Sequence, residues 1–215
     1  MPKDSYEEGC RLFLVVPPEM SHDMAVQVAE AGSAGTIACA LLRCQPDGHI
    51  NRDLADMLLR FTRFAGIPLL LERDIAAAVE LDADGIHIPA DEDLYLDARQ
   101  ALGEEKIVGV ECGQSRHDAL SLGEMGADYI AFKGSMDTAP NSIELGLEEL
   151  IDWWSNTVTI PSVAWDTSDV DTAKLLADAG ADFVAAGDPV WSHPEGAAAA
   201  VRQLNEKLSE LKASP

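Results

Sequence analysis

The sequence has few basic residues and no long apolar run. Its 15 Lys and Arg stand against 38 Asp and Glu, which gives a formal net charge of −23 and an isoelectric point near 4.3. Because a chain with this charge repels polyanions, nucleic acid and anionic membrane surfaces are not expected as partners. No apolar stretch approaches the roughly 18 residues of a membrane-spanning helix, so no span is expected. The acid excess by itself indicates solubility.

Cysteine is also scarce. The four cysteines, Cys10, Cys39, Cys44 and Cys112, show no Cys-x-x-Cys spacing. The first residues, 1–8, are acidic where a secretory signal would be basic, and no long apolar stretch follows them. These features indicate free thiols in a reducing compartment, so we expect a cytoplasmic protein.

What is present is an ordinary globular composition over 215 residues, with 47% hydrophobic and 25% charged residues. That length and apolar content allow a sizeable buried core. The chain shows no break in composition and no linker rich in Pro or Ser. We therefore expect a single domain over residues 1–215, in which residues 1–10 form a flexible N-terminal segment.

Short apolar runs alternate with amphipathic stretches of helical length along the whole chain. The predicted strands lie near residues 12–16, 37–42, 68–71, 84–88, 107–110, 129–132, 161–164 and 182–186. The predicted helices lie at about 22–32, 51–65, 74–82, 93–103, 116–126, 144–155, 169–179 and 195–212. Because the apolar runs are continuous rather than alternating, each strand is expected to be buried on both faces, as in a parallel sheet.

About eight βα units in 215 residues match a compact α/β fold, the (β/α)8 or TIM barrel. An Ala-Asp dipeptide precedes three of the apolar runs, at 83–84, 127–128 and 181–182. A doubly wound open sheet is the alternative, but no Gly-x-Gly-x-x-Gly follows the first predicted strand. The sequence therefore predicts the barrel.

Several segments carry a resemblance to a known family: Asp84–Ile88, Ile107–Val110, Gly126–Ile130, Ser115–His117 and Val190–Pro194. Over nearly its whole length the chain resembles thiamine phosphate synthase and its relative, the thiazole tautomerase TenI. The resemblance implies a TIM barrel that joins a pyrimidine diphosphate to a thiazole phosphate. In that reaction diphosphate leaves with the help of Mg²⁺ and of cationic side chains, which stabilise its developing negative charge.

The family's ligands on the second to fourth strands are partly substituted. Its second-strand motif, Gln-x-Arg-x-Lys, keeps its arginine as Arg43 but has Gln45 in place of its lysine. Its third-strand motif, Asn-Asp-Arg, begins with Glu72 and Arg73, so that a cation replaces a metal-ligating carboxylate. The second metal-ligating Asp falls on Glu92. The resemblance therefore implies Mg²⁺ as a cofactor, with Glu92 as its one remaining ligand.

The positions after the later strands are substituted as well. The family's Ser after the fifth strand falls on Glu111, and its Thr-x-Thr-Lys loop runs from Thr138 to Asn141, without the lysine. The Gly-Gly-Ile phosphate loop after the seventh strand begins with Asp166, and the eighth-strand motif ends on Asp188. Two carboxylates therefore stand where the resemblance implies a phosphate.

The carboxyl ends of barrel strands form the functional face, so these side chains are expected to share a mouth. The expected rim carboxylates are Glu72, Asp74, Asp91, Glu92, Asp93, Glu111, Asp137, Asp166 and Asp188. We expect a negative pocket with Arg43 or Arg73 as its main cation. Two interpretations stay open. One is a repurposed acidic pocket for a cationic ligand or hard metal ions, and the other is a decayed site with Arg73 and Lys133 in ion pairs.

Other residues have both a chemical and a structural interpretation. Lys133 ends the sixth predicted strand, where barrel enzymes can hold a Schiff-base lysine, but acidic neighbours favour its charged form. His87 is expected to be a hydrogen-bonded residue of the barrel interior. Ser115 is predicted to cap the next helix. Trp153 and Trp154 fit either a helix packed on the barrel or a dimer contact.

The resemblance and its substitutions lead to a prediction of function. We expect a thiamine phosphate synthase-like protein of thiamine metabolism, a transferase with impaired catalysis that takes a small-molecule ligand. The family positions for substrate are Arg43, Glu72, Arg73, Glu111, Lys133, Thr138, Asp166 and Asp188. The alternative is a non-synthase barrel that binds or regulates, or that acts on a different small substrate. The sequence assigns no catalytic residue and leaves enzymatic activity and homo-oligomerisation open.

Overall fold

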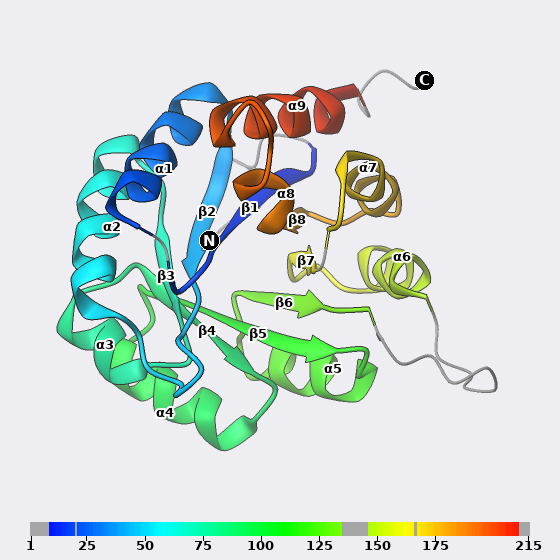
Figure 1. Cartoon of the computed structure of the whole chain (residues 1–215). Helices are drawn as coiled ribbons and strands as arrows, with labels where there is room; N and C mark the ends of the chain where they lie inside the picture. Colours follow the sequence, from blue (N-terminus) through cyan, green and yellow to red (C-terminus); the bar gives the residue numbers. More distant parts are fainter. Residues whose placement is uncertain (1–8, 20, 135–145, 166, 211–215) are drawn as a thin grey trace.

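The computed structural model describes residues 9–19, 21–134, 146–165 and 167–210, and its strands form one closed parallel barrel in the order β1 to β8 (Figure 1). The strands are β1 (Arg11–Val16), β2 (Ile37–Leu42), β3 (Leu69–Glu72), β4 (Gly85–Pro89), β5 (Ile107–Gly113), β6 (Tyr129–Phe132), β7 (Ser162–Ala164) and β8 (Phe183–Ala186). Every neighbouring pair is parallel, so the predicted TIM barrel is confirmed. The segment expected at 1–10 falls largely outside the described residues.

Apart from one short turn beside β1 and β8, the helices wrap the outside of the barrel (Figure 1). They are α1 (His22–Ala34), α2 (Arg52–Ala65), α3 (Ile75–Glu80), α4 (Glu92–Leu102), α5 (Arg116–Glu124), α6 (Leu147–Thr157), α7 (Val170–Asp178), α8 (Asp188–Trp191) and α9 (Ala197–Ser209). The helix α8 was not predicted, because its four residues are too few to show a helical period in the sequence.

Side-chain caps explain where five of the helices begin. Asn51, Asp74, Asp91, Ser115 and Asp169 each accept a hydrogen bond from the backbone N–H three residues further on. Such a cap satisfies one of the N–H groups that the first turn of a helix leaves without a partner. The predicted cap at Ser115 is thus confirmed.

The repeated Ala-Asp dipeptide has a structural role at the amino ends of the strands. Asp84 accepts a hydrogen bond from Leu69 N–H at 2.8 Å, and Asp128 accepts one from Val108 N–H at 2.8 Å. The third copy repeats the arrangement, since Asp182 accepts from the N–H at the start of β7 at 2.9 Å. Each aspartate therefore joins its own strand to the start of the preceding strand.

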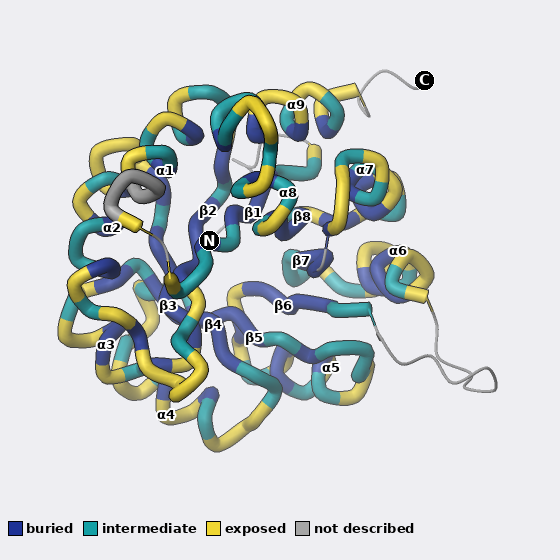
Figure 2. Tube along the Cα trace, viewed as in Figure 1, coloured by how far each residue is buried: buried dark blue, intermediate teal, exposed yellow. Residues whose placement is uncertain are grey.

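The core has two layers, one between strands and helices and one inside the barrel. The strands are buried and the outer helix faces are exposed (Figure 2). The inner layer consists of Phe13, Cys39, Leu41, Leu70, Tyr129, Ala131, Val163, Trp165 and Ala185. In the outer layer Trp154 is buried and donates to Ile160 O at 2.8 Å. For Trp154 the first of the two interpretations, packing of its helix on the barrel, is therefore correct. No helix among the described residues is long and apolar enough to cross a membrane.

Candidate functional site

A cavity of about 1010 Å³ opens at the carboxyl ends of the strands. Its wall is formed by residues at the ends of β1, β2, β3, β6, β7 and β8, in the loops that follow them, and in α8. The charged lining residues are Arg43, Glu72, Arg73, Lys133 and Asp188. Five of the eight predicted substrate positions therefore share one cavity. Thr138 and Asp166 lie outside the described residues, and Glu111 does not line the cavity.

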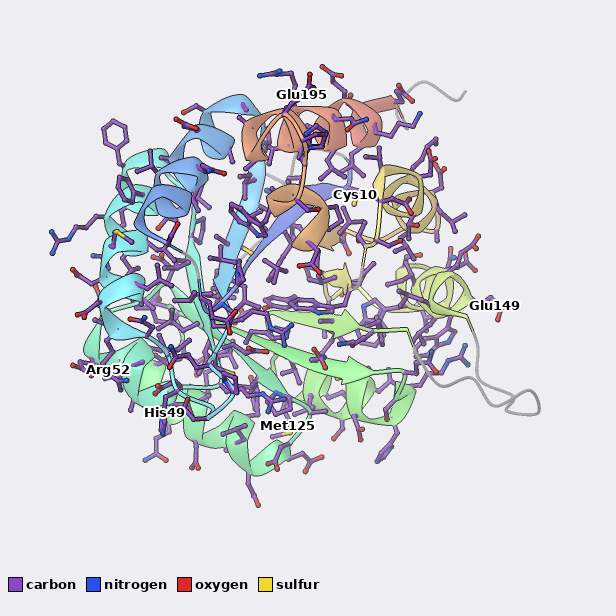
Figure 3. The ribbon with its side chains drawn as sticks, in the orientation of Figure 1. Cys10, His49, Arg52, Met125, Glu149 and Glu195 are labelled. Carbon is purple, nitrogen blue, oxygen red and sulfur yellow. The ribbon has the colours of Figure 1, made fainter. Side chains whose placement is uncertain are left out.

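The described lining is not the negative pocket that the sequence led us to expect. Three cations face two carboxylates, so the formal charge of the described wall is +1 (3 − 2). Two of the carboxylates expected in the pocket, Asp74 and Asp91, instead cap helices, where each accepts a hydrogen bond from a backbone N–H. Asp74 also accepts from Ile50 N–H and lies within 4 Å of His49 and Arg52. Figure 3 shows His49 and Arg52 on the side of the barrel that α3 and α4 cover.

The predicted metal ligand, Glu92, is directed away from the cavity. Its Oε1 accepts a hydrogen bond from Ser121 Oγ on α5 at 2.6 Å, and Glu92 is absent from the cavity wall. The expectation that Glu92 joins Glu72 at the mouth is therefore wrong. Within the described ranges, no three His, Cys, Asp or Glu residues are grouped as metal ligands. The described side chains do not fit the Mg²⁺ site that the resemblance implies.

Glu72 and Arg43 form the ion pair that closes one side of the cavity. Arg43 Nε lies 3.3 Å from Glu72 Oε2, which also accepts the backbone N–H of Cys44 at 2.9 Å. Burial of Glu72, which is 5% exposed, opposes its ionisation. The Cys44 N–H and the Arg43 charge outweigh burial, so the pKa of Glu72 is lowered from its usual value. Glu72 is thus a carboxylate already committed to protein donors.

This pair predicts a pH-dependent stability. We expect Glu72→Gln to reduce the free energy of unfolding at neutral pH by about 1–2 kcal/mol, because it removes the charged acceptor of Arg43. A carboxylate whose folded pKa is depressed stabilises the fold above its unfolded pKa of about 4.3, and this contribution disappears as pH falls through the folded pKa. The wild-type and variant urea midpoints should therefore converge as the pH falls through the folded pKa of Glu72, which lies below its usual value.

The exposed pair of Glu80 with Arg52 supplies the control. Glu80→Gln should change the urea midpoint little at either pH, because exposed ion pairs contribute about 0–1 kcal/mol. A Glu72→Gln deficit of equal size at pH 7 and pH 3 would contradict the assignment.

Arg73 follows β3 in a strained backbone conformation. Its φ is 63°, and only Arg73 and Asp82 show positive φ among the described non-glycine residues. Asp74 N–H donates to Glu72 O at 2.8 Å across Arg73, which is the hydrogen bond of a γ-turn with positive φ, a rare and strained turn. A residue held this way costs about 1–3 kcal/mol and is found mainly at functional sites.

The side chain of Arg73 is a cation without an ion-pair partner among the described residues. It is exposed and lines the cavity, and it forms no hydrogen bond or ion pair within the described part of the chain. Arg43, by contrast, is paired with Glu72 at 3.3 Å. Lys133, on the opposite side of the barrel at the end of β6, lies close enough to Glu111 to lower the pKa of that carboxyl. The lining cations therefore differ in their availability to a ligand.

Beneath the cavity lies a buried aromatic cluster around His87. His87 Nδ1 is 2.8 Å from Tyr129 Oη, and its ring stacks on Trp165 at 4.9 Å between centroids. Burial raises the pKa of Tyr129, so its hydroxyl stays protonated and can donate to His87. The expected hydrogen-bonded histidine of the barrel interior is thus confirmed.

Glu111 joins this cluster to the charges above it. Its Oε2 lies 3.9 Å from His87 Nε2, which is an ion-pair distance and too long for a hydrogen bond. Interaction with His87 lowers the pKa of Glu111 against the opposing effect of burial, and the charges of Lys133 and Arg43 add to it. Glu111 therefore stays ionised at the floor of the site.

The cavity wall also contains aromatic and hydroxyl side chains that were not among the predicted substrate positions. Trp165 and Thr167 flank the end of β7, and Trp191 in α8 donates from Nε1 to Val15 O at 2.6 Å. Thr167 is 3% exposed, and its Oγ1 has no hydrogen-bond partner among the described atoms. An aromatic residue directly after an apolar strand was the available signal for Trp165. Thr167 falls in the loop that matches the family's Gly-Gly-Ile motif, but the sequence does not indicate that its hydroxyl is buried.

The fold and the cavity together define a TIM barrel with a charged ligand cavity at the carboxyl ends of its strands. The family model described as "Thiamine monophosphate synthase" matches residues 12–190. This protein therefore belongs to the thiamine monophosphate synthase family.

Individual relatives agree with this assignment. The thiamine-phosphate synthase of Rhodospirillum centenum is 38% identical over 211 residues, which cover 93% of this chain and 98% of the relative. The thiamine-phosphate synthase of Hyphomonas neptunium is 34% identical over 209 residues, covering 94% and 95%. Thiamine phosphate pyrophosphorylase from Pyrococcus furiosus has a TM-score of 0.76 at 21% identity, covering 94% and 96%. That structural likeness shows the shared fold.

Proposed function

We propose that this thiamine phosphate synthase-like protein binds the phosphorylated precursors of thiamine phosphate in its cavity and that its condensation step is impaired. The observation that carries the proposal is the convergence of Arg43, Arg73 and Lys133 on one cavity wall. In a chain with a formal net charge of −23, such a local group of cations favours an anionic ligand. Two relatives named thiamine-phosphate synthase support the choice of precursors.

The proposed impairment rests on the same wall. Gln45 lines the cavity where the resemblance implies a lysine, and Glu92 is directed toward α5. Asp188 adds a carboxylate where the resemblance implies the thiazole phosphate. These features also favour the alternative, a barrel that binds a small molecule without synthase turnover. The four free cysteines support the cytoplasm as its proposed location.

Thermal shift tests the binding part of the proposal. A ligand that binds only the folded state at about 100 times its Kd adds about 2.7 kcal/mol of stability. For a chain of this size we therefore expect the pyrimidine diphosphate or the thiazole phosphate to raise the melting temperature by about 5–10 °C.

The dephosphorylated pyrimidine and thiazole alcohols are the matched controls. They should shift the melting temperature far less, because they lack the group that the cations bind. If neither phosphorylated precursor shifts the melting temperature, the proposed function is wrong.

A further inference from the structure

We infer that Arg73 takes the place of a metal ion in this cavity, so that the protein binds a diphosphate group without a divalent cation. The inference rests on the proposed function for its choice of ligand and goes beyond it in the chemistry of binding. Protein donors engage the carboxylates of Glu72 and Asp74 on either side of Arg73. The Arg73 guanidinium has no partner among the described residues, and neither has the buried hydroxyl of Thr167.

The two carboxylates that flank Arg73 in the chain, Glu72 and Asp74, both accept hydrogen bonds from other parts of the protein. Glu72 accepts from Cys44 N–H at 2.9 Å and pairs with Arg43. Asp74 accepts from the N–H groups of Ala77 and Ile50, at 2.9 and 3.1 Å. Mg²⁺ needs oxygen ligands in near-ideal octahedral geometry, and these carboxylates have lone pairs already occupied by protein donors. A metal ion at this place would have to displace the hydrogen bonds that hold β2, β3 and α3 together.

Arg73 itself is suited to an anion. Its guanidinium carries a positive charge and five N–H donors in a planar fork that matches phosphate oxygens in pairs. The two consecutive turns at the end of β3 fix its backbone, since Asp74 N–H donates to Glu72 O and Ile75 N–H donates to Arg73 O. The chain thus maintains, in a costly conformation, an arginine whose side chain forms no hydrogen bond or ion pair with the described residues. A ligand is the partner that this side chain lacks.

The rest of the wall supplies further donors. Arg43 and Lys133 line the same cavity as Arg73. Thr167 also belongs to this wall, and its hydroxyl is buried without a partner among the described residues. A buried hydroxyl left unpaired costs free energy, which a phosphate oxygen would recover by accepting its hydrogen bond. Fixed cations and an unpaired donor therefore provide the charge neutralisation that Mg²⁺ would otherwise supply.

Calorimetric titration of inorganic pyrophosphate into the full-length protein tests this inference. We expect the same Kd, within about twofold, in EDTA and in Mg²⁺. The Kd in Mg²⁺ is calculated from the concentration of free pyrophosphate, which is lower there because Mg²⁺ binds pyrophosphate in solution. Arg73→Gln should weaken binding in EDTA at least about tenfold, because it removes a charge-assisted donor pair. Arg60→Gln removes the same charge from an exposed site on α2, where Arg60 pairs with Asp56, and should leave the Kd unchanged.

Arg73→Gly separates a binding role from a structural one. Glycine adopts a φ of 63° without strain, so this variant should melt at or above the wild-type temperature while losing pyrophosphate affinity. A lower melting temperature, or wild-type affinity in Arg73→Gln, would overturn the inference. So would binding that is at least tenfold weaker in EDTA than in Mg²⁺, an outcome that leaves the proposed function intact. If pyrophosphate binds in neither buffer and the precursors give no thermal shift, both proposals fail.

Discussion

The purified protein is expected to form thiamine phosphate at least about a thousandfold more slowly than an authentic synthase supplied with the same precursors and Mg²⁺. Departure of diphosphate requires stabilisation of its developing charge, and loss of one preorganised donor costs about 3–4 kcal/mol, or a hundred- to a thousandfold in rate. Gln45 lines the cavity in place of one expected cation, and Arg73 stands where a metal ligand is expected. A fixed guanidinium carries one positive charge where Mg²⁺ carries two, so binding can persist while catalysis declines.

The assay measures kcat/KM for condensation of the two precursors, with the authentic synthase as the positive control. Gln45→Lys restores the cation that the resemblance implies and should raise kcat/KM roughly tenfold. Gln45→Met, which has a similar volume without charge, should recover none. Turnover within about tenfold of the control would defeat the prediction, and Arg43, Arg73 and Lys133 would then be the working clamp on the diphosphate.

The barrel could be predicted because its signals are local and repeated. Continuous apolar runs such as residues 37–42 specify strands buried on both faces, and the amphipathic stretches between them specify covering helices. Gly126 and Gly180, after α5 and α7, have φ of 102° and 100°, the positive values at which glycine ends a helix without strain. Such features depend on residues close together in the chain, so one sequence is enough to find them.

The site could be predicted only in part, because position along a strand does not determine where a side chain finds its partner. Arg43, Glu72 and Arg73 lie in the cavity, as their places at strand ends indicated. Glu92 is directed to Ser121, a residue 29 positions away on a neighbouring helix that no spacing argument identifies. The described part of the wall lacks the predicted excess of carboxylates for the same reason, since the sequence does not show which hydrogen bonds engage a carboxylate in the folded chain.

Gly109 on β5 is expected to be the most sensitive position among the glycines of the barrel wall. A Cβ added there would lie 1.9 Å from the ring of Tyr129, well inside van der Waals contact. Tyr129 is 5% exposed, its ring centroid lies 5.7 Å from that of Phe13, and its hydroxyl lies 2.8 Å from His87 Nδ1, so a shift of the ring would break both contacts. We expect Gly109→Ala to lower the free energy of unfolding by about 3 kcal/mol or more, as overpacking of a rigid core does.

The measurement is thermal unfolding, in which this loss corresponds to a drop of about 6–12 °C in Tm. Gly134→Ala is the matched control, because a Cβ there meets no described atom within 4 Å, and its Tm should change little. Tyr129→Leu should rescue much of the defect when combined with Gly109→Ala, since removal of the ring removes the clash, and the double-mutant cycle should show strong coupling. A Gly109→Ala protein that melts within about 1 °C of the wild type would mean that the ring has room to move. In that case the aromatic cluster of Tyr129 and His87 beneath the cavity would be less rigid than its packing indicates.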